Sequence, residues 1–258
     1  MLVIRPEQMD AFRSVARRGF EDEMVAHLAQ FSPPLFEAVG EEQLRTAIRL
    51  GVGRAEGYGL TFRGPTRLYL ELMLLFGSHF DTDPQYPWAA EILGEQESGS
   101  QMDRAERLYE RVVDYRRKVA GPNDVHTFQA LRNIAVLARQ PLAFSMENLP
   151  AAMRQEVWRI YPEKAAYVGD AALEALIQKG IGGARRQRFA TVRGTALVIV
   201  LMLAFGHGCG ADPLYPWIAR TLQDEKIVDA EARAKRLETK ALTWLSHVLG
   251  NYDEEAKA

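Results

Sequence analysis

The stretch LMLLFGSHFDTDPQYPWAAEIL, Leu72–Leu93, recurs as LMLAFGHGCGADPLYPWIARTL, Leu201–Leu222, with every position shifted by 129 residues. The shift keeps Phe-Gly, Asp-Pro and Tyr-Pro-Trp in place without an insertion or deletion. A constant spacing indicates internal duplication, so we expect two related units in tandem, with Trp88 and Trp217 in equivalent buried positions. The same shift pairs further residues over about 70 positions: Pro33 with Pro162, Gly40 with Gly169, Gly51 with Gly180, and Gly53 with Gly182.

His79, Asp81 and Asp83 alternate along the first copy and offer the nitrogen and oxygen donors of a divalent metal site. Such a site would make the chain a metal-dependent hydrolase. In the second copy, Gly208 and Gly210 replace the histidine and the first aspartate, and only the Asp-Pro pair recurs. We therefore expect the recurring pair to begin a helix, with aspartate as N-cap and proline as first helical residue: Asp83 and Pro84, Asp212 and Pro213.

Apolar residues follow helical spacing almost everywhere, and no segment alternates as a half-buried strand would. Pro6 and the Ser-Pro-Pro segment at 32–34 bound a first helix, whose predicted buried face carries Phe12, Val15, Phe20, Met24, His27, Leu28 and Phe31. The predicted fold class is all-α, with two tandem related helical units packed by pseudo-two-fold symmetry into one compact body. We expect the first unit at 1–121, a connecting helix and linker at 122–148, and the second unit with a polar C-terminal tail at 149–258.

The composition is that of a protein with a buried core, since 47% of the 258 residues are hydrophobic. Cys209 is the only cysteine and gives no reason to expect an oxidising compartment. The longest apolar run, Thr195–Phe205, is shorter than the roughly 20 residues that span a bilayer, and we expect a helix buried on all sides there. The first residues lack the apolar core of a signal peptide. These features predict a cytoplasmic protein.

No stretch carries a recognisable catalytic motif. The glycine-rich segment GVGRAEGYG, residues 51–59, lies in a helical pattern without the preceding strand and the Lys-Ser/Thr pair of a phosphate-binding loop. Cys209 has no counterpart in the first half and no obvious acid to orient a catalytic histidine. We therefore expect no enzymatic activity, no cofactor and no metal.

The first half is acidic: residues 1–129 carry a net charge of −5, and residues 130–258 carry +3. Paired carboxylates can act as catalytic acid and base, but runs of like charge on a helix are more often solvated or partner-binding faces. We therefore expect the two acidic runs of this half to bind a partner. Together they are called the acidic patch: Glu21, Asp22, Glu23, Glu41 and Glu42.

The segments RPEQMDAF (5–12), FEDEMVAHL (20–28) and Leu72–Leu93 resemble helical immunity proteins that accompany type VI secretion effectors in Gram-negative bacteria. The similarity is strongest over residues 4–120 and extends to the second half through the repeat. The whole chain is similar to an immunity protein that neutralises a restriction-endonuclease-like nuclease toxin of that system. The resemblance implies a cognate toxin as protein partner, with no direct binding of nucleic acid or membrane. It transfers no catalytic or partner-contacting residue.

Two alternatives to an immunity protein remain open. An effector-loading adaptor or chaperone of the same secretion system would bind the effector and a component of the secretion spike without protecting the cell. A metal-dependent enzyme using His79, Asp81 and Asp83 would bind a metal on its own. An acidic inhibitor suits a basic nuclease, because opposite charges speed the encounter and select against other partners. We therefore expect the acidic patch to contact the toxin.

Overall fold

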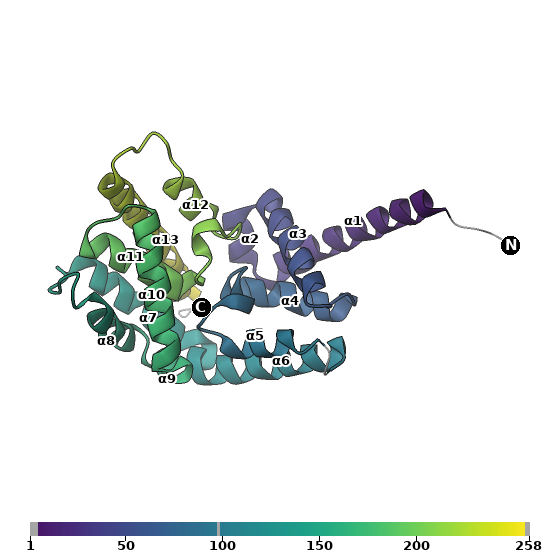
Figure 1. The fold of residues 1–258 in the computed structure, drawn as a ribbon, viewed down its shortest axis with the longest axis horizontal. Helices are drawn as coiled ribbons and strands as arrows, with labels where there is room; N and C mark the ends of the chain where they lie inside the picture. Colours follow the sequence, from purple (N-terminus) through teal and green to yellow (C-terminus); the bar gives the residue numbers. More distant parts are fainter. Residues whose placement is uncertain (1–4, 97–98, 256–258) are drawn as a thin grey trace.

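A computed structural model describes residues 5–96 and 99–255, and within these ranges the chain forms helices and no strand (Figure 1). The all-α prediction is confirmed. No helix in the described part of the chain is both long and apolar enough to cross a membrane.

In the described residues of the first half there are six α-helices. Proline begins several of them, and glycine at positive φ ends others, at Gly40 and Gly77. Ser100 begins the last one with a capping box, because its hydroxyl accepts the Asp103 amide at 3.2 Å and its own amide donates to the Asp103 carboxylate at 3.1 Å. The elements are α1 (Pro6–Phe31), α2 (Pro33–Val39), α3 (Glu41–Gly57), α4 (Arg63–Phe76), the 3₁₀ turn η1 (Phe80–Thr82), α5 (Pro87–Gly94), α6 (Gln101–Tyr115) and the π turn η2 (Arg116–Ala120).

The connection and the second half follow Gly121, which has a φ of 73°. The connection consists of the 3₁₀ turn η3 (Pro122–Asp124), helix α7 (Val125–Arg139) and the segment 140–148. The second half then contains α8 (Leu149–Ile160), α9 (Pro162–Val168), α10 (Asp170–Arg186), α11 (Val192–Phe205), the 3₁₀ turn η4 (Cys209–Ala211), α12 (Pro216–Leu222) and α13 (Ala230–Glu255).

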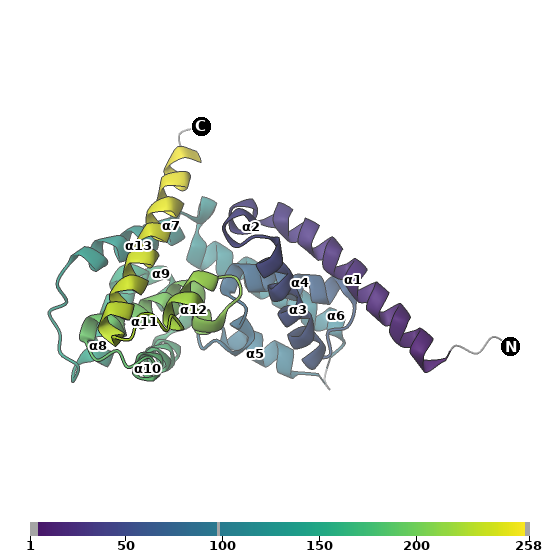
Figure 2. The same ribbon diagram turned by 90° about the horizontal axis from the view of Figure 1, so that it is seen from above.

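The helix boundaries of the second half repeat those of the first half 129 residues further along. Both ends coincide at this shift for α2 with α9, α3 with α10, α4 with α11, and η1 with η4. In Figures 1 and 2 the first half of the chain lies at the right of the view and the second half at the left. Helix α7 lies among the helices of the second half. The junction between the halves therefore lies near the turns that follow α4 and α11.

Each half has an aromatic cluster around the phenylalanine that ends α4 or α11. The Phe76 and Trp88 ring centroids lie 6.0 Å apart, and those of Phe205 and Trp217 also lie 6.0 Å apart. Trp88 is buried, as predicted, but Trp217 is only half-buried. The prediction for Thr195–Phe205 holds along nearly the whole of α11, whose residues are almost all buried.

Helix α1 has the predicted ends but not the predicted continuous buried face. Met24 and Leu28 are fully buried in the core, whereas Phe12 is 64% and Val15 is 69% exposed. The prediction is wrong for the residues before Phe20, because α1 extends beyond the other helices of the first half (Figures 1 and 2). It is also wrong for Phe31, the last residue of α1, which is 42% exposed. Helical spacing identified an apolar face, but it could not tell which part of that face the rest of the chain reaches.

Candidate functional site

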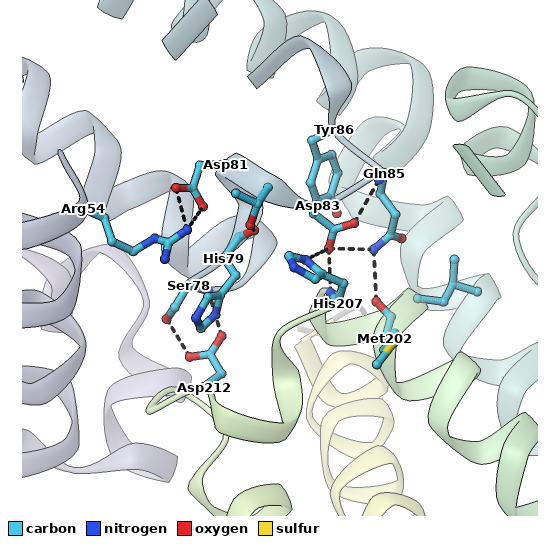
Figure 3. Close-up of polar contacts among 12 residues, drawn as sticks. Arg54, Ser78, His79, Asp81, Asp83, Gln85, Tyr86, Met202, His207 and Asp212 are labelled. Atoms are coloured by element: carbon cyan, nitrogen blue, oxygen red, sulfur yellow. Dashed lines mark hydrogen bonds and ion pairs between the residues drawn. The ribbon is translucent and has the colours of Figure 1, made fainter. Parts of the chain in front are cut away.

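Residues 78–85 and their counterparts at 207–214 meet at the junction between the halves (Figure 3). Each stretch follows a helix that ends at a glycine with positive φ, 91° at Gly77 and 87° at Gly206. A Cβ at Gly77 would lie 2.5 Å from the carbonyl oxygen of Phe205, and one at Gly206 would lie 2.8 Å from that of Phe76. Both positions require glycine, because the backbone is left-handed and the opposite segment approaches closely.

Asp83 and Asp212 bond across this junction in a reciprocal way. The Asp83 carboxylate accepts the backbone amide of His207 at 2.6 Å, and the Asp212 carboxylate accepts the backbone amide of Ser78 at 2.7 Å. The Ser78 hydroxyl donates a second bond to Asp212, at 2.6 Å. Because Ser78 and His207 directly follow the glycines that end α4 and α11, each aspartate satisfies a backbone amide at a helix end of the opposite half.

The prediction that Asp83 and Pro84 begin a helix is wrong. Helix α5 begins at Pro87, with Tyr86 as its N-cap residue. Pro84 lies in the preceding turn, where the Asp83 carboxylate accepts the Gln85 amide at 2.9 Å. Pro87 fixes the first helical φ, so the carboxylate is free to bond to the other half. The second half departs from the prediction in the same way: α12 begins at Pro216 instead of Pro213, and Asp212 accepts the Leu214 amide at 2.9 Å.

Asp81 and His79, the other candidate metal ligands, have separate surroundings (Figure 3). The buried carboxylate of Asp81 accepts two bonds from the Arg54 guanidinium, at 2.5 and 2.7 Å. The His79 and His207 rings are nearly perpendicular, with their centroids 6.2 Å apart. Burial together with the Arg54 charge lowers the pKa of His79. In the described ranges, no group of three or more His, Cys, Asp or Glu side chains is placed to hold a metal ion.

Lys164 of α9 is a buried cation beside this junction, and no pattern in the sequence predicted it. Its ammonium group donates to the Leu203 carbonyl at 2.8 Å and lies 3.4 Å from the Tyr86 hydroxyl. Burial lowers the pKa of Lys164 to about 8, although the Asp83 charge acts in the opposite direction. The amine therefore satisfies a carbonyl near the end of α11. The repeat gave no signal, since the counterpart of this lysine is Leu35.

Glu21 anchors the acidic patch where α1 lies against α3. Its carboxylate accepts bonds from Arg49 at 2.8 and 3.0 Å and from Arg45 at 3.2 Å, and only 16% of its side chain is exposed. The hydrogen bond from Arg49 lowers the pKa of Glu21, against the opposing effect of burial. Glu21 therefore joins α1 to α3 and has little free surface for a partner.

The other residues of the acidic patch are more exposed. Asp22 and Glu41 contact Arg45 at 2.7 and 2.8 Å and keep 65% and 57% of their side chains exposed. Glu42 is exposed beside Glu41 on α3, and Glu23 pairs instead with Arg63 of α4. The structure thus brings Glu21, Asp22 and Glu41 together at Arg45 and directs Glu23 to a different helix.

Comparisons of the chain with protein-family models, with curated proteins and with solved structures found no match. The polar side chains at the junction bond to one another and to the backbone of the opposite half. The acidic patch, in contrast, has carboxylates at the surface, where Asp22 and Glu41 are 65% and 57% exposed.

Proposed function

We propose that this chain is an immunity protein that binds a cognate nuclease effector of a type VI secretion system in the cytoplasm and neutralises it. The observation that carries the proposal is the arrangement of the acidic patch. Carboxylates from Glu21, Asp22 and Glu41 surround the guanidinium of Arg45, and two of the three remain exposed. The resemblance of the N-terminal segments to immunity proteins of that system adds support.

Electrostatics explains how such a patch would act. A nuclease approaches phosphate groups and therefore presents cations on its surface. Exposed carboxylates at the edge of an interface raise the association rate more than they slow dissociation. Asp22 and Glu41 are already held by Arg45, so their side chains lose little conformational freedom when a partner binds. Inhibition of this kind needs neither a cofactor nor a reaction.

The test is co-expression with the toxin encoded by the neighbouring gene, followed by measurement of binding kinetics. Glu41→Lys/Glu42→Lys should slow association about tenfold at low salt, and added salt should shrink the difference. Glu21 is not substituted in these variants, because its loss would remove the bonds that join α1 to Arg49 of α3. The matched control is Glu147→Lys/Glu225→Lys, which makes the same charge change at exposed positions elsewhere in the chain.

Each outcome of this test bears on one part of the proposal. An unchanged association rate at low salt would show that the toxin uses another surface. A wild-type chain that binds the effector without protecting cells would favour the adaptor or chaperone, with a secretion-spike component as a further partner. A chain that neither binds nor protects would refute the immunity function.

We also infer that the two halves arose by internal duplication. The equal shift of the helix boundaries supports this inference, as do the reciprocal bonds of Asp83 and Asp212. Gly77 and Gly206 make matching close approaches to the opposite backbone. Substitutions at paired positions should therefore have similar effects on the free energy of unfolding.

A further inference from the structure

Two apolar surfaces of the first half have no covering segment among the described residues. The first is on the part of α1 that extends beyond the body (Figures 1 and 2). Met9, Phe12 and Val15 are 40%, 64% and 69% exposed and are spaced by three residues, so they lie near one another along the helix. We call them the α1 stripe.

The second surface lies along the neighbouring helices α4 and α6. Leu75 of α4 is 40% exposed, and Tyr109 and Val113 of α6 are 59% and 48% exposed. Leu68 of α4 is half-buried and packs on the core. Because α4 and α6 contact each other, we take these four residues to mark one apolar surface along the two helices, called the α4/α6 groove.

The second half shows what occupies the equivalent place. Shifted by 129 residues, the α4/α6 groove corresponds to the surface of α11 and α13, and α7 lies over it. Leu131, Ile134 and Leu137 of α7 line a small apolar cavity of about 80 Å³ together with residues of α11 and α13. That lining includes the counterparts of all four groove residues: Leu197, Ala204, Glu238 and Leu242.

The first half cannot close its own groove in this way. Helix α7 is followed by the segment 140–148, which lets the chain turn before α8 begins. Helix α1 is continuous from Pro6 to Phe31, and the Arg17–Glu56 ion pair at 2.8 Å holds it against α3. The α1 stripe is therefore carried away from the groove of its own chain.

The exposed part of α1 nevertheless has the apolar spacing of α7. MDAFRSVAR, residues 9–17, aligns with LRNIAVLAR, residues 131–139, so that the residues of the α1 stripe stand where α7 has Leu131, Ile134 and Leu137. Both segments end in Ala-Arg. An amphipathic helix with this spacing is what a groove between two helices binds. Exposed Glu106 and Glu110 of α6 also complement the exposed Arg18 of α1.

We propose that two copies of this chain form a reciprocal dimer, in which the α1 stripe of each copy occupies the α4/α6 groove of the other. The arrangement is an isologous two-fold interface, because the same pair of surfaces is used twice and no surface is left open for further growth. Both apolar surfaces are removed from water in one step. The dimer does not depend on the immunity function.

The first test measures the mass of the purified full chain in solution at micromolar concentration by light scattering and sedimentation. We expect twice the chain mass of 29.0 kDa. Phe12→Glu/Val15→Glu and Tyr109→Glu/Val113→Glu should each give the monomer mass with unchanged helical content. The matched control, Val136→Glu/Val228→Glu, also adds two charges at exposed valines and should remain dimeric. A monomeric wild-type chain, or a dimer that survives both disruptive variants, would overturn the proposal.

The second test locates the contact and separates exchange between chains from folding back within one chain. Phe12→Cys combined with Tyr109→Cys should form a disulfide under mild oxidation that doubles the mass on a non-reducing gel. The native Cys209 is buried, and burial raises its pKa to about 12, so it does not compete. A disulfide within one chain, or no disulfide at all, would overturn the proposal.

Discussion

Replacing Asp83 with alanine is the sharpest test of how the halves are joined. The substitution leaves the backbone amides of His207 and Gln85 without the acceptor that now lies at 2.6 and 2.9 Å. It also removes the acceptor of the Gln85 side-chain amide at 3.2 Å. Asp83 is buried, so water cannot replace these bonds without opening the junction.

The expected cost follows from these contacts. Each buried donor left without a partner costs about 1–3 kcal/mol, and relief from burying the charge offsets part of the total. We expect Asp83→Ala to lower the free energy of unfolding by about 3–5 kcal/mol. An aspartate that only capped a helix would cost about 0.5–2 kcal/mol. The difference between the two ranges measures the contribution of the bond to the other half.

Urea unfolding followed by circular dichroism measures this cost, with Asp224→Ala as the matched control. Asp224 accepts the amide two residues on, at 3.0 Å, as Asp83 does, but it is half-buried and this bond stays within its own turn. Its loss should cost about 0.5–1.5 kcal/mol. Asp212→Ala should resemble Asp83→Ala, and the double variant should cost less than the two single costs together, because both act on one junction. Equal costs for Asp83→Ala and Asp224→Ala would refute this account of the junction.

Three further predictions concern the same region. Gly77→Ala and Gly206→Ala should each cost about 1–3 kcal/mol more than Gly40→Ala in urea unfolding, because Gly40 has a similar φ of 81° but no atom near its Cβ position. The free energy of unfolding of the wild type relative to Lys164→Met should rise between pH 8 and 10, by up to about 1.4 kcal/mol per pH unit, because the lysine stays protonated longer in the unfolded chain. Burial raises the pKa of Asp83, but the hydrogen bonds to its carboxylate outweigh burial, so this pKa lies below its ordinary value. The ionised carboxylate should therefore stabilise the fold above about pH 4, and this stabilisation should be lost as the pH falls further. Asp83→Asn should flatten that part of the pH profile of unfolding.

Local sequence signals predicted the helices well because their causes are local. Pro6 and the Ser-Pro-Pro segment at 32–34 act on their own backbone torsions, so both ends of α1 follow from residue type. Helix α2 was not predicted, although Pro33 begins it and Gly40 ends it. The start of α5 was mispredicted because two Pro residues, Pro84 and Pro87, offer equivalent starts. Which proline begins the helix depends on the partner of the Asp83 carboxylate. That carboxylate accepts the amide of His207, more than 100 residues away in the sequence.

The composition of the candidate site was less predictable, because its contacts join distant parts of the chain. Glu21 and Asp22 form part of the predicted acidic patch, but their pairing with Arg45 depends on how α1 lies against α3. Lys164 has no motif, and its role follows only from the position of the Leu203 carbonyl. Runs of charged residues therefore indicated a charged surface, whereas the ion-pair partner of each residue could be identified only in the packed structure.

The difference between His79 and Gly208 has a cause in the packing of the junction. These residues are counterparts in the repeat, and they meet: a Cβ at Gly208 would lie 2.4 Å from Nδ1 of His79. Where a residue contacts its own counterpart, two copies of one large side chain would occupy the same space. A ring on one side therefore requires a small residue on the other. The glycine at position 208, which argued against a metal site in the sequence, is thus explained by its packing against His79.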